Sequence, residues 1–257
     1  MSAIVLAAGK GTRMRSELPK VCHHVGGRPM VRAVVEACLQ AGCDRVVVVV
    51  GYRQELVREA LAAEAESGRV AFAVQDQQLG TGHAVRCAAE HDGTLAGDDH
   101  DTLVLCGDGP LIRPETLCAL VERHRSARAA ATLATAILDD PTGYGRVVRD
   151  GSGAFERIVE EKDAAESELA IREVNPSYYC FRAAQLFRAL RRVERNDRTG
   201  EYYLTDVPAM LRDDGERVEV IEAVPREDVL SINTPEQLEA VDRVFRSRTA
   251  AATGGPE

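Results

Sequence analysis

The chain has 257 residues, of which 45% are hydrophobic and 28% are charged, a composition typical of globular proteins. This length can be accommodated by one α/β domain, and no apolar run is long enough to cross a bilayer. The formal net charge of −9 disfavours nucleic-acid binding, which requires accumulated Lys and Arg. A small anionic ligand is compatible with this charge where basic residues gather locally.

The amino terminus and the cysteines both indicate a cytoplasmic protein. No basic segment precedes the short apolar run in MSAIVLAAGKG, which is typical of a first strand and not of a signal peptide. The seven cysteines are odd in number and none forms the C-x-x-C spacing of zinc or redox sites. We therefore expect reduced thiols, no membrane or nucleic-acid partner, and a monomer or small homo-oligomer.

In the first half of the chain, short β-branched runs alternate with segments of helical spacing. The runs predict buried strands over residues 3–7, 45–50, 70–74 and 102–105. Apolar residues three or four positions apart predict helices over residues 30–40, 54–66 and 83–90. This order predicts an α/β fold with a Rossmann-like, doubly wound, mainly parallel sheet.

The second half is less regular and predicts a mixed sheet with a lobe added over one end. Strands are expected over 130–138, 146–148, 155–159 and 177–181, separated by Pro-Thr-Gly-Tyr-Gly and Asp-Gly-Ser-Gly turns. Helices over 183–194 and 205–213, a strand over 218–224 and a last helix after Thr234-Pro235 follow. Residues 250–257 are small and polar, and we expect a disordered tail.

The most informative segment is LAAGKGTRM at residues 6–14, followed by Leu18-Pro19-Lys20, where the first strand should end. Its glycines allow backbone N–H groups to approach a phosphate, and Lys10, Arg13 and Lys20 add positive charge. Neither the Walker A pattern nor the Rossmann fingerprint fits the spacing. A plain glycine-rich turn is the alternative, but three basic residues in an acidic chain favour a triphosphate site.

These segments resemble the signature of the sugar-1-phosphate nucleotidyltransferase superfamily, and most closely the uridylyltransferase domain of bacterial N-acetylglucosamine-1-phosphate uridylyltransferases. Further matching blocks, in the correct order, are QLGTGHA at 78–84, CGD at 106–108, DPTGYGR at 140–146, IVEEKDA at 158–164, EVN at 173–175 and GEYYLTD at 200–206. The resemblance implies the nucleotide-diphospho-sugar transferase fold in one domain over residues 1–249. Its halves would bind the nucleotide (1–110) and the sugar phosphate (111–249).

The implied reaction joins UTP to N-acetylglucosamine-1-phosphate with Mg²⁺, giving UDP-N-acetylglucosamine, a cell-wall precursor, and pyrophosphate. Arg13 and Lys20 would be catalytic. The implied nucleotide contacts are Leu6, Ala7, Gly9, Gly11, Gln75, Gln78, Gly80 and Thr81. An amide carries both a donor and an acceptor, so Gln75 or Gln78 suits the edge of a pyrimidine. Without the neighbouring glycines, both would be read as solvated loop residues.

The resemblance also implies a metal pair and a sugar-phosphate site. Asp108 and Asn233 match the magnesium ligands, and hard oxygen donors suit this ion. The implied sugar-side residues are Gly145, Glu160, Asn175 and Thr205. Alternatives remain for individual positions: a turn residue for Asn233, a surface charge for Glu160 and a turn cap for Asn175.

Departures from the family pattern concern the acceptor and the carboxyl-terminal region. Cys106 stands where Tyr is usual, Gly109 where Val is typical, and Asn175-Pro176-Ser177 replaces Asn-Thr-Gly. We therefore expect the acceptor pocket to differ in shape. Another pyrimidine nucleotide, another sugar phosphate or an inactive nucleotide-sugar sensor are the alternatives. No hexapeptide repeat follows, so we expect neither the acetyl transfer nor the β-helix trimer of the bifunctional relatives.

Overall fold

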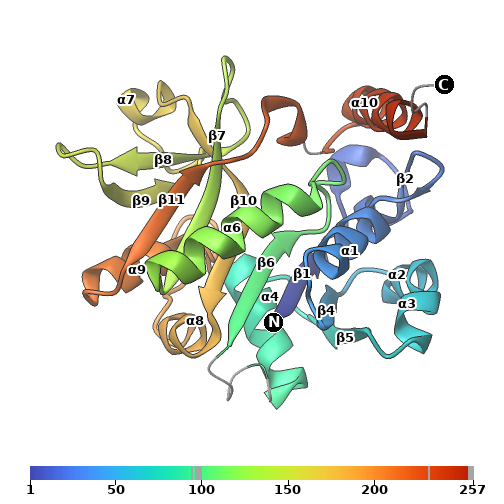
Figure 1. The fold of residues 1–257 in the computed structure, drawn as a ribbon, viewed down its shortest axis with the longest axis horizontal. Coiled ribbons are helices and arrows are strands. Elements are labelled where there is room, and N and C mark those ends of the chain that lie inside the picture. Colours follow the sequence, from blue (N-terminus) through green and yellow to red (C-terminus); the bar gives the residue numbers. More distant parts are fainter. Residues whose placement is uncertain (94, 96–99, 231, 254–257) are drawn as a thin grey trace.

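A nine-stranded sheet organises the computed structural model, which describes residues 1–93, 95, 100–230 and 232–253 (Figure 1). Seven of its strands follow the order β11-β7-β10-β6-β1-β4-β5, and the other two, described below, lie off this path. Neighbours pair in parallel except at β10, which runs antiparallel to β6 and β7. The bounds are β1 (Ser2–Ala7), β4 (Arg45–Val50), β5 (Val70–Val74), β6 (Asp101–Cys106), β7 (Ala131–Ile137), β10 (Glu173–Arg182) and β11 (Val218–Glu222). This mainly parallel mixed sheet confirms the expected fold class.

Helices cover both faces of the sheet, which explains why its central strands are hydrophobic without alternation. In β4, Val46, Val48 and Val50 belong to one buried cluster, whereas Val47 and Val49 belong to the other. The first cluster is completed by α1 (Met30–Gln40) and α6 (Pro114–Ala127), which lie across the sheet in Figure 1. The second is completed by α4 (Thr81–His91), α8 (Ala183–Leu190) and α9 (Asp206–Asp213).

Helix α6 was not expected from the sequence. Pro114 occupies its first turn, where a missing N–H is tolerated, and Leu117, Leu120 and Val121 face the core. The helix ends at Ala127, and the residue that caps it, Arg128, adopts φ of 52°. The spacing of these apolar residues, three or four positions apart, is nevertheless typical of a helix.

Two expected helices are shorter in the structure. The segment 54–66 divides into α2 (Gln54–Ala60) and α3 (Ala62–Glu66), because Leu61 leaves helical geometry, with φ of −120°, and is completely buried. Helix α8 ends at Leu190 and not at 194, since the chain turns there to bury Val193. Tertiary burial overrides local helical spacing at both places.

The expected lobe is a hairpin of β8 (Gly145–Arg149) and β9 (Phe155–Val159), followed by α7 (Glu166–Leu169). Strand β8 also pairs with β10, so the lobe is continuous with the main sheet. Strand β10 begins four residues earlier than expected, and its register against β7 shifts between Val174 and Tyr178. Pro176 lies at this bulge, where a strand tolerates the missing N–H.

The ends of the central strands meet at one edge of the sheet. Leu6 at the end of β1 lies opposite Cys106 at the end of β6, and Gly107 N donates to Leu6 O at 2.9 Å. After β4, Tyr52 N donates to Ala8 O at 3.0 Å. This edge therefore gathers the loops that the sequence analysis singled out, as expected for a ligand site in an open α/β sheet.

The remaining elements connect or cover these layers. They are η1 (Thr12–Met14), η2 (Lys20–Cys22), β2 (His24–Val25), β3 (Arg28–Pro29), η3 (Arg226–Asp228) and α10 (Pro235–Thr253). Helix α10 continues through residue 253, so the expectation of a disordered tail from residue 250 is wrong for 250–253, and 254–257 lie outside the described residues. The 19-residue helix carries apolar residues that pack on the core, and packing of such a face extends a helix beyond its local signals.

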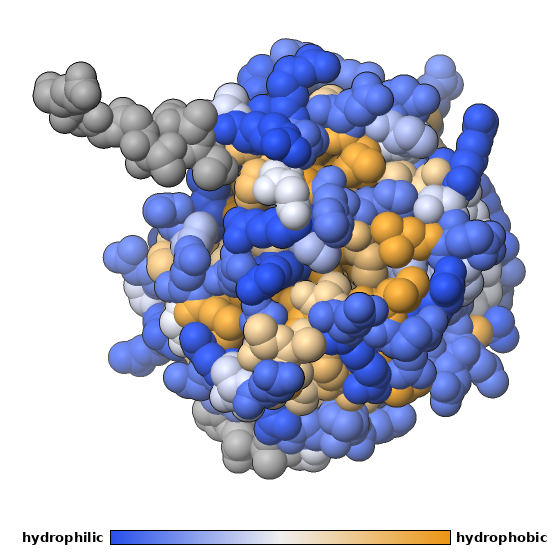
Figure 2. Space-filling view, turned by 90° about the vertical axis from the view of Figure 1, so that its right-hand side faces the viewer, coloured by the Kyte–Doolittle hydropathy of each residue, from blue (hydrophilic) through white to orange (hydrophobic). Residues whose placement is uncertain are grey.

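Hydrophilic residues dominate the side of the molecule that carries α10 and α2, with hydrophobic residues in patches between them (Figure 2). Within the described residues, no helix combines the length and the hydropathy that spanning a membrane requires.

Candidate active site

Two adjoining cavities open at the carboxyl edge of the central strands. The smaller, of about 190 Å³, is lined by residues of the first 110, namely Leu6, Ala7, Ala8, Gly9, Lys20, Val21, Gln75, Gly80, Thr81, Ala84, Cys106 and Asp108. The larger, of about 350 Å³, extends over the β8–β10 lobe. Lys20, Thr81, Cys106 and Asp108 line both cavities and mark their junction.

The glycine loop shapes the smaller cavity and lets a lysine reach the junction. An added Cβ at Gly9 would meet nothing within 4 Å, so the loop backbone is open to a ligand. Gly11 has φ of +69°, and a Cβ there would lie 2.5 Å from Lys20 Cβ. Gly11 is therefore required by both its conformation and the close passage of Lys20.

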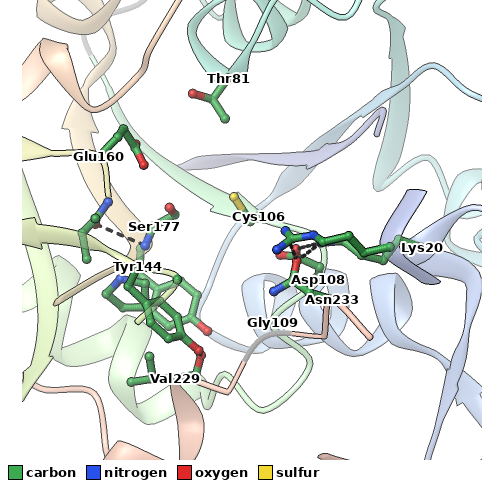
Figure 3. Close-up of a pocket in the computed structure, with 16 residues that line it drawn as sticks. Lys20, Thr81, Cys106, Asp108, Gly109, Tyr144, Glu160, Ser177, Val229 and Asn233 are labelled. Atoms are coloured by element: carbon green, nitrogen blue, oxygen red, sulfur yellow. Dashed lines mark hydrogen bonds and ion pairs between the residues drawn. The ribbon is translucent and has the colours of Figure 1, made fainter. Parts of the chain in front are cut away.

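Four side chains predicted to act on phosphates and metal meet at the junction, although they come from distant parts of the chain. Three of them, Lys20, Asp108 and Asn233, are labelled in Figure 3. The Lys20 ammonium forms a short ion pair with the Asp108 carboxylate and donates to Asn233 Oδ1 at 3.1 Å. Arg13 also donates to Asn233 Oδ1, at 2.8 Å. The lysine and aspartate side chains are 17% and 21% exposed, so their attraction is less screened than that of a surface pair.

The donor set around Lys20 suits a divalent cation that also binds substrate. The carboxylate of Asp108 and the amide oxygen of Asn233 already converge on one positive charge, the Lys20 ammonium. Among the described residues, no group of three or more His, Cys, Asp or Glu side chains forms a self-contained metal cage. Two protein oxygens completed by phosphate and water are typical of Mg²⁺ sites.

The residues predicted to recognise the base divide into two kinds. Gln75 is 4% exposed and lines the smaller cavity, with its Nε2 donating to Gly80 O at 3.1 Å and to His83 Nδ1 at 2.9 Å. Gln78 instead donates its amide N–H to Ala8 O at 2.8 Å. In this state Gln78 supports the glycine loop, while Gln75 faces the cavity.

The segment around Gly80 is joined to the distant Gly200–Asp206 motif through backbone hydrogen bonds. Tyr202 N donates to Leu79 O and Gly82 N donates to Tyr202 O, both at 2.8 Å. The Thr81 hydroxyl oxygen accepts from Leu204 N at 3.0 Å. Gly80 has φ of +95°, and an added Cβ would lie 2.6 Å from Tyr202 O. The Gly200–Asp206 motif thereby fixes the position of the start of helix α4.

The four predicted sugar-side residues gather around the larger cavity. Gly145, Glu160 and Asn175 line it, and Thr205 lies in an adjoining small cavity, donating its hydroxyl to Glu160 Oε1 at 3.0 Å. Burial raises the pKa of the Glu160 carboxyl. Asn175 is 5% exposed and donates to the Tyr179 hydroxyl at 2.6 Å.

Neighbouring glutamates at the end of β9 have different surroundings. Glu161 accepts from the buried Arg146 guanidinium at 3.1 Å and from Gly143 N at 2.5 Å, so it fixes the turn before β8. Glu160 faces the cavity instead. Of these two adjacent glutamates, Glu161 therefore stabilises the turn and Glu160 lines the cavity.

Several lining residues were not assigned from the sequence, among them Tyr144, Tyr178 and Val229. The Tyr144 hydroxyl donates to Val229 O at 3.1 Å and links the turn before β8 to the segment before α10. Tyr144 lies within the quoted Pro-Thr-Gly-Tyr-Gly turn, so that motif carried its signal. Tyr178 is 1% exposed, and its hydroxyl would lie 2.7 Å from a Cβ at Gly109. The close approach of Tyr178 to Gly109 could be seen only in the folded structure.

Known proteins resemble this chain over most of its length. A model of the MobA-like NTP transferase domain matches residues 3–207. The "Bifunctional protein GlmU" of Geobacillus thermodenitrificans is 48% identical over 246 residues, and that of Geobacillus sp. strain WCH70 is 45% identical. Each alignment covers 96% of this chain and 52% of the relative, so the chain spans about half the length of these relatives.

Among solved structures, a UDP-glucose pyrophosphorylase complexed with UDP-glucose superposes with a TM-score of 0.75 at 16% identity, over 96% of this chain and 98% of the other. The shared fold and the family match define a nucleotidyltransferase. More particularly, the chain belongs to the family of MobA-like NTP transferase domains and is similar to the GlmU proteins over nearly its whole length.

Proposed function

We propose that this protein transfers a uridylyl group from UTP to N-acetylglucosamine-1-phosphate, giving UDP-N-acetylglucosamine and pyrophosphate. The observation that carries this proposal is the junction of the two cavities at Lys20 and Asp108. The smaller cavity is built from the glycine loop and Gln75, and the larger is lined by Glu160 and Asn175. A nucleotide and a sugar phosphate in these cavities would meet at their charged groups.

The residues at the junction suit an in-line attack by a sugar-phosphate oxygen on the α-phosphorus, with pyrophosphate leaving on the opposite side. Such transfers depend on positioning and charge stabilisation and need no covalent enzyme intermediate. Arg13 and Lys20 would neutralise the attacked and leaving phosphates, and Gly9 and Gly11 would admit the triphosphate to the loop. Asp108 and Asn233 would hold Mg²⁺, which when bound polarises phosphate oxygens and orients both substrates.

The proposal divides the domain over residues 1–249 into a nucleotide half and a sugar-phosphate half near residue 110. In support, each described residue that lines the smaller cavity comes from the first half. The uridine preference is supported by the fold neighbour whose structure contains UDP-glucose. The N-acetylglucosamine acceptor rests on the sequence motifs and on the GlmU relatives.

A different sugar phosphate is the second candidate, favoured by one region of the larger cavity. Cys106, Gly109 and Ser177 line that cavity and depart from the pattern of the uridylyltransferases that the sequence resembles. Glucose-1-phosphate is the first acceptor to compare, because the fold neighbour binds UDP-glucose.

The test is pyrophosphate release with Mg²⁺ for UTP, CTP, dTTP, GTP and ATP, each paired with N-acetylglucosamine-1-phosphate, glucosamine-1-phosphate, glucose-1-phosphate and mannose-1-phosphate. Highest kcat/KM for UTP with N-acetylglucosamine-1-phosphate is expected. A different best pair would reassign the substrates and keep the reaction class. No turnover with any pair, together with tight UTP binding, would contradict the proposal and favour an inactive nucleotide-sugar sensor.

A further inference from the structure

Ser177 has a backbone conformation that its residue type disfavours. Its φ is +64°, in the left-handed region that L residues other than glycine rarely adopt. Among the described residues, three others share a positive φ without being glycine: Arg15, Arg53 and Arg128. Each of these arginines borders a helix, where such geometry is common, whereas Ser177 lies within strand β10 and lines the larger cavity.

The neighbours of Ser177 hold this conformation in place. Its N–H donates to Asn175 Oδ1 at 3.2 Å, and the strand pairing with β7 skips from Val174 to Tyr178. Tyr178 is 1% exposed, with its hydroxyl in the space that the absence of a side chain at Gly109 leaves open. The conformation is therefore imposed from both sides of Ser177.

The fold does not require a serine at this position. Glycine adopts a positive φ without steric conflict, so the backbone alone would favour it. The side chain of Ser177 is instead presented to the cavity, where it lies between Cys106 and Glu160 (Figure 3). Strained residues of this kind gather at functional sites.

We propose that Ser177 determines acceptor specificity, with its hydroxyl hydrogen-bonding a polar substituent of the sugar ring. This inference rests on the proposed function and extends it to a residue that the nucleotidyltransferase motifs do not assign. A hydroxyl both donates and accepts, so it can pair with a sugar hydroxyl or an amide. Cys106 is small and leaves the hydroxyl accessible: Ser177 is half-buried and lines both the larger cavity and the small one beside Thr205.

Two variants separate this role from a structural one. Ser177→Gly removes the hydroxyl and relieves the backbone, whereas Ser177→Ala removes the hydroxyl and keeps the strain. Loss of one hydrogen bond predicts a KM for the sugar phosphate about threefold to tenfold higher in both variants. The KM for UTP should stay within about twofold of wild type, since Ser177 does not line the smaller cavity. Ser177→Gly should unfold at the same or a higher temperature than wild type.

The experiment is steady-state kinetics of wild type and both variants, with thermal unfolding of each. An unchanged sugar-phosphate KM in both variants, beside normal wild-type turnover, would overturn the inference alone. An equal increase in the KM for UTP and the KM for the sugar phosphate would also overturn it, because it would indicate a general distortion of the site. Wild type without turnover on any sugar phosphate would overturn the proposed function and this inference together.

Discussion

Lys20 is the side chain on which the proposed chemistry depends most directly, because its ammonium lies between the two predicted metal ligands, Asp108 and Asn233. Gly11 provides the space for it, and Arg13 contacts the same asparagine oxygen. The charge pattern of the glycine loop predicted a phosphate site, but not that a lysine would contact the carboxylate before substrate arrives. If a triphosphate and a metal bind, Lys20 must exchange its contacts with Asp108 and Asn233 for contacts with phosphate oxygens.

Replacing this lysine should abolish most of the turnover. We expect Lys20→Ala to lower kcat by about a hundredfold to a thousandfold, as for the loss of one preorganised electrostatic contact. The comparison variant is Lys10→Ala, from the same loop, whose ammonium lies over the Tyr52 ring at 5.1 Å. It should lose less than about tenfold, since its ammonium does not point into the cavities. Near-normal kcat in folded Lys20→Ala would contradict the role of Lys20.

Glu160 makes stability depend on pH in a predictable direction. Burial raises its pKa in the folded state, so the folded protein binds this proton more readily than the unfolded chain. The resulting stabilisation is complete below the unfolded pKa of about 4.3 and is lost as pH rises through the folded pKa. Glu160→Gln cannot ionise and still offers an acceptor to Thr205.

Urea unfolding at pH 4, 6 and 8 measures this effect. Glu160→Gln should match wild type at pH 4 and have a higher free energy of unfolding than wild type at pH 8. The adjacent Glu161→Gln should show the opposite at pH 8, because it weakens the acceptor of the buried Arg146. A Glu160→Gln protein less stable than wild type at pH 8 would refute the burial argument.

The contact between the segments 79–82 and 202–204 positions one wall of the smaller cavity. It depends on Gly80, whose φ is +95° and where an added Cβ would lie 2.6 Å from Tyr202 O. Helix α4 begins at the next residue, so its amino-terminal turn is fixed by the same contact. A side chain at position 80 must therefore disturb both the backbone and the cavity.

Gly80→Ala and Gly68→Ala form a matched pair. Gly68 also has a positive φ, +77°, but an added Cβ there meets nothing within 4 Å. Gly68→Ala should lower the free energy of unfolding by about 1 kcal/mol through φ alone. Gly80→Ala adds the clash with Tyr202 and should lose at least about 1 kcal/mol more, with weaker UTP binding. Equal losses of unfolding free energy in the two variants, measured by urea titration, would contradict the predicted clash with Tyr202.

The sequence was most informative where local pattern and burial agree. The strands at 45–50 and 70–74 were predicted with their observed bounds, because each is an uninterrupted run of apolar residues after its first position, and the run in β4 is buried on both faces. The bulge at Pro176 was not predictable, since it depends on pairing with β7, a strand far away in the chain. Likewise, Asn233 lies 213 positions from Lys20, and only the folded chain brings the two into contact.

At the level of the whole molecule, Asp228 links the segments that precede α6 and α10 to helix α10 itself, beside the larger cavity. It is completely buried and pairs with Arg113, next to α6, at 2.5 Å and with Arg248 of α10 through a short ion pair. Val229, the next residue, accepts the hydroxyl of Tyr144 and lines the cavity. The shape of the larger cavity, the proposed acceptor site, therefore depends on an ion-pair cluster outside it.

Neutralising this carboxylate should destabilise the whole domain. Asp228→Asn leaves two guanidinium groups without their buried counter-charge and is expected to lower the free energy of unfolding by about 2–3 kcal/mol. The control is Asp139→Asn, whose side chain is 77% exposed although it also pairs with two arginines, and which should change stability by less than about 1 kcal/mol. Equal effects in urea titrations would contradict the structural role of Asp228.

The central claim is that the junction at Lys20 and Asp108 joins a uridine nucleotide to a sugar phosphate. The most direct measurement is mass spectrometry of the products formed from UTP and N-acetylglucosamine-1-phosphate with Mg²⁺, by wild type and by Asp108→Asn. We predict UDP-N-acetylglucosamine and pyrophosphate in equal amounts from wild type, and at least about a hundredfold slower formation by the variant. UDP-N-acetylglucosamine formed equally fast by both proteins, or none formed by wild type, would contradict it.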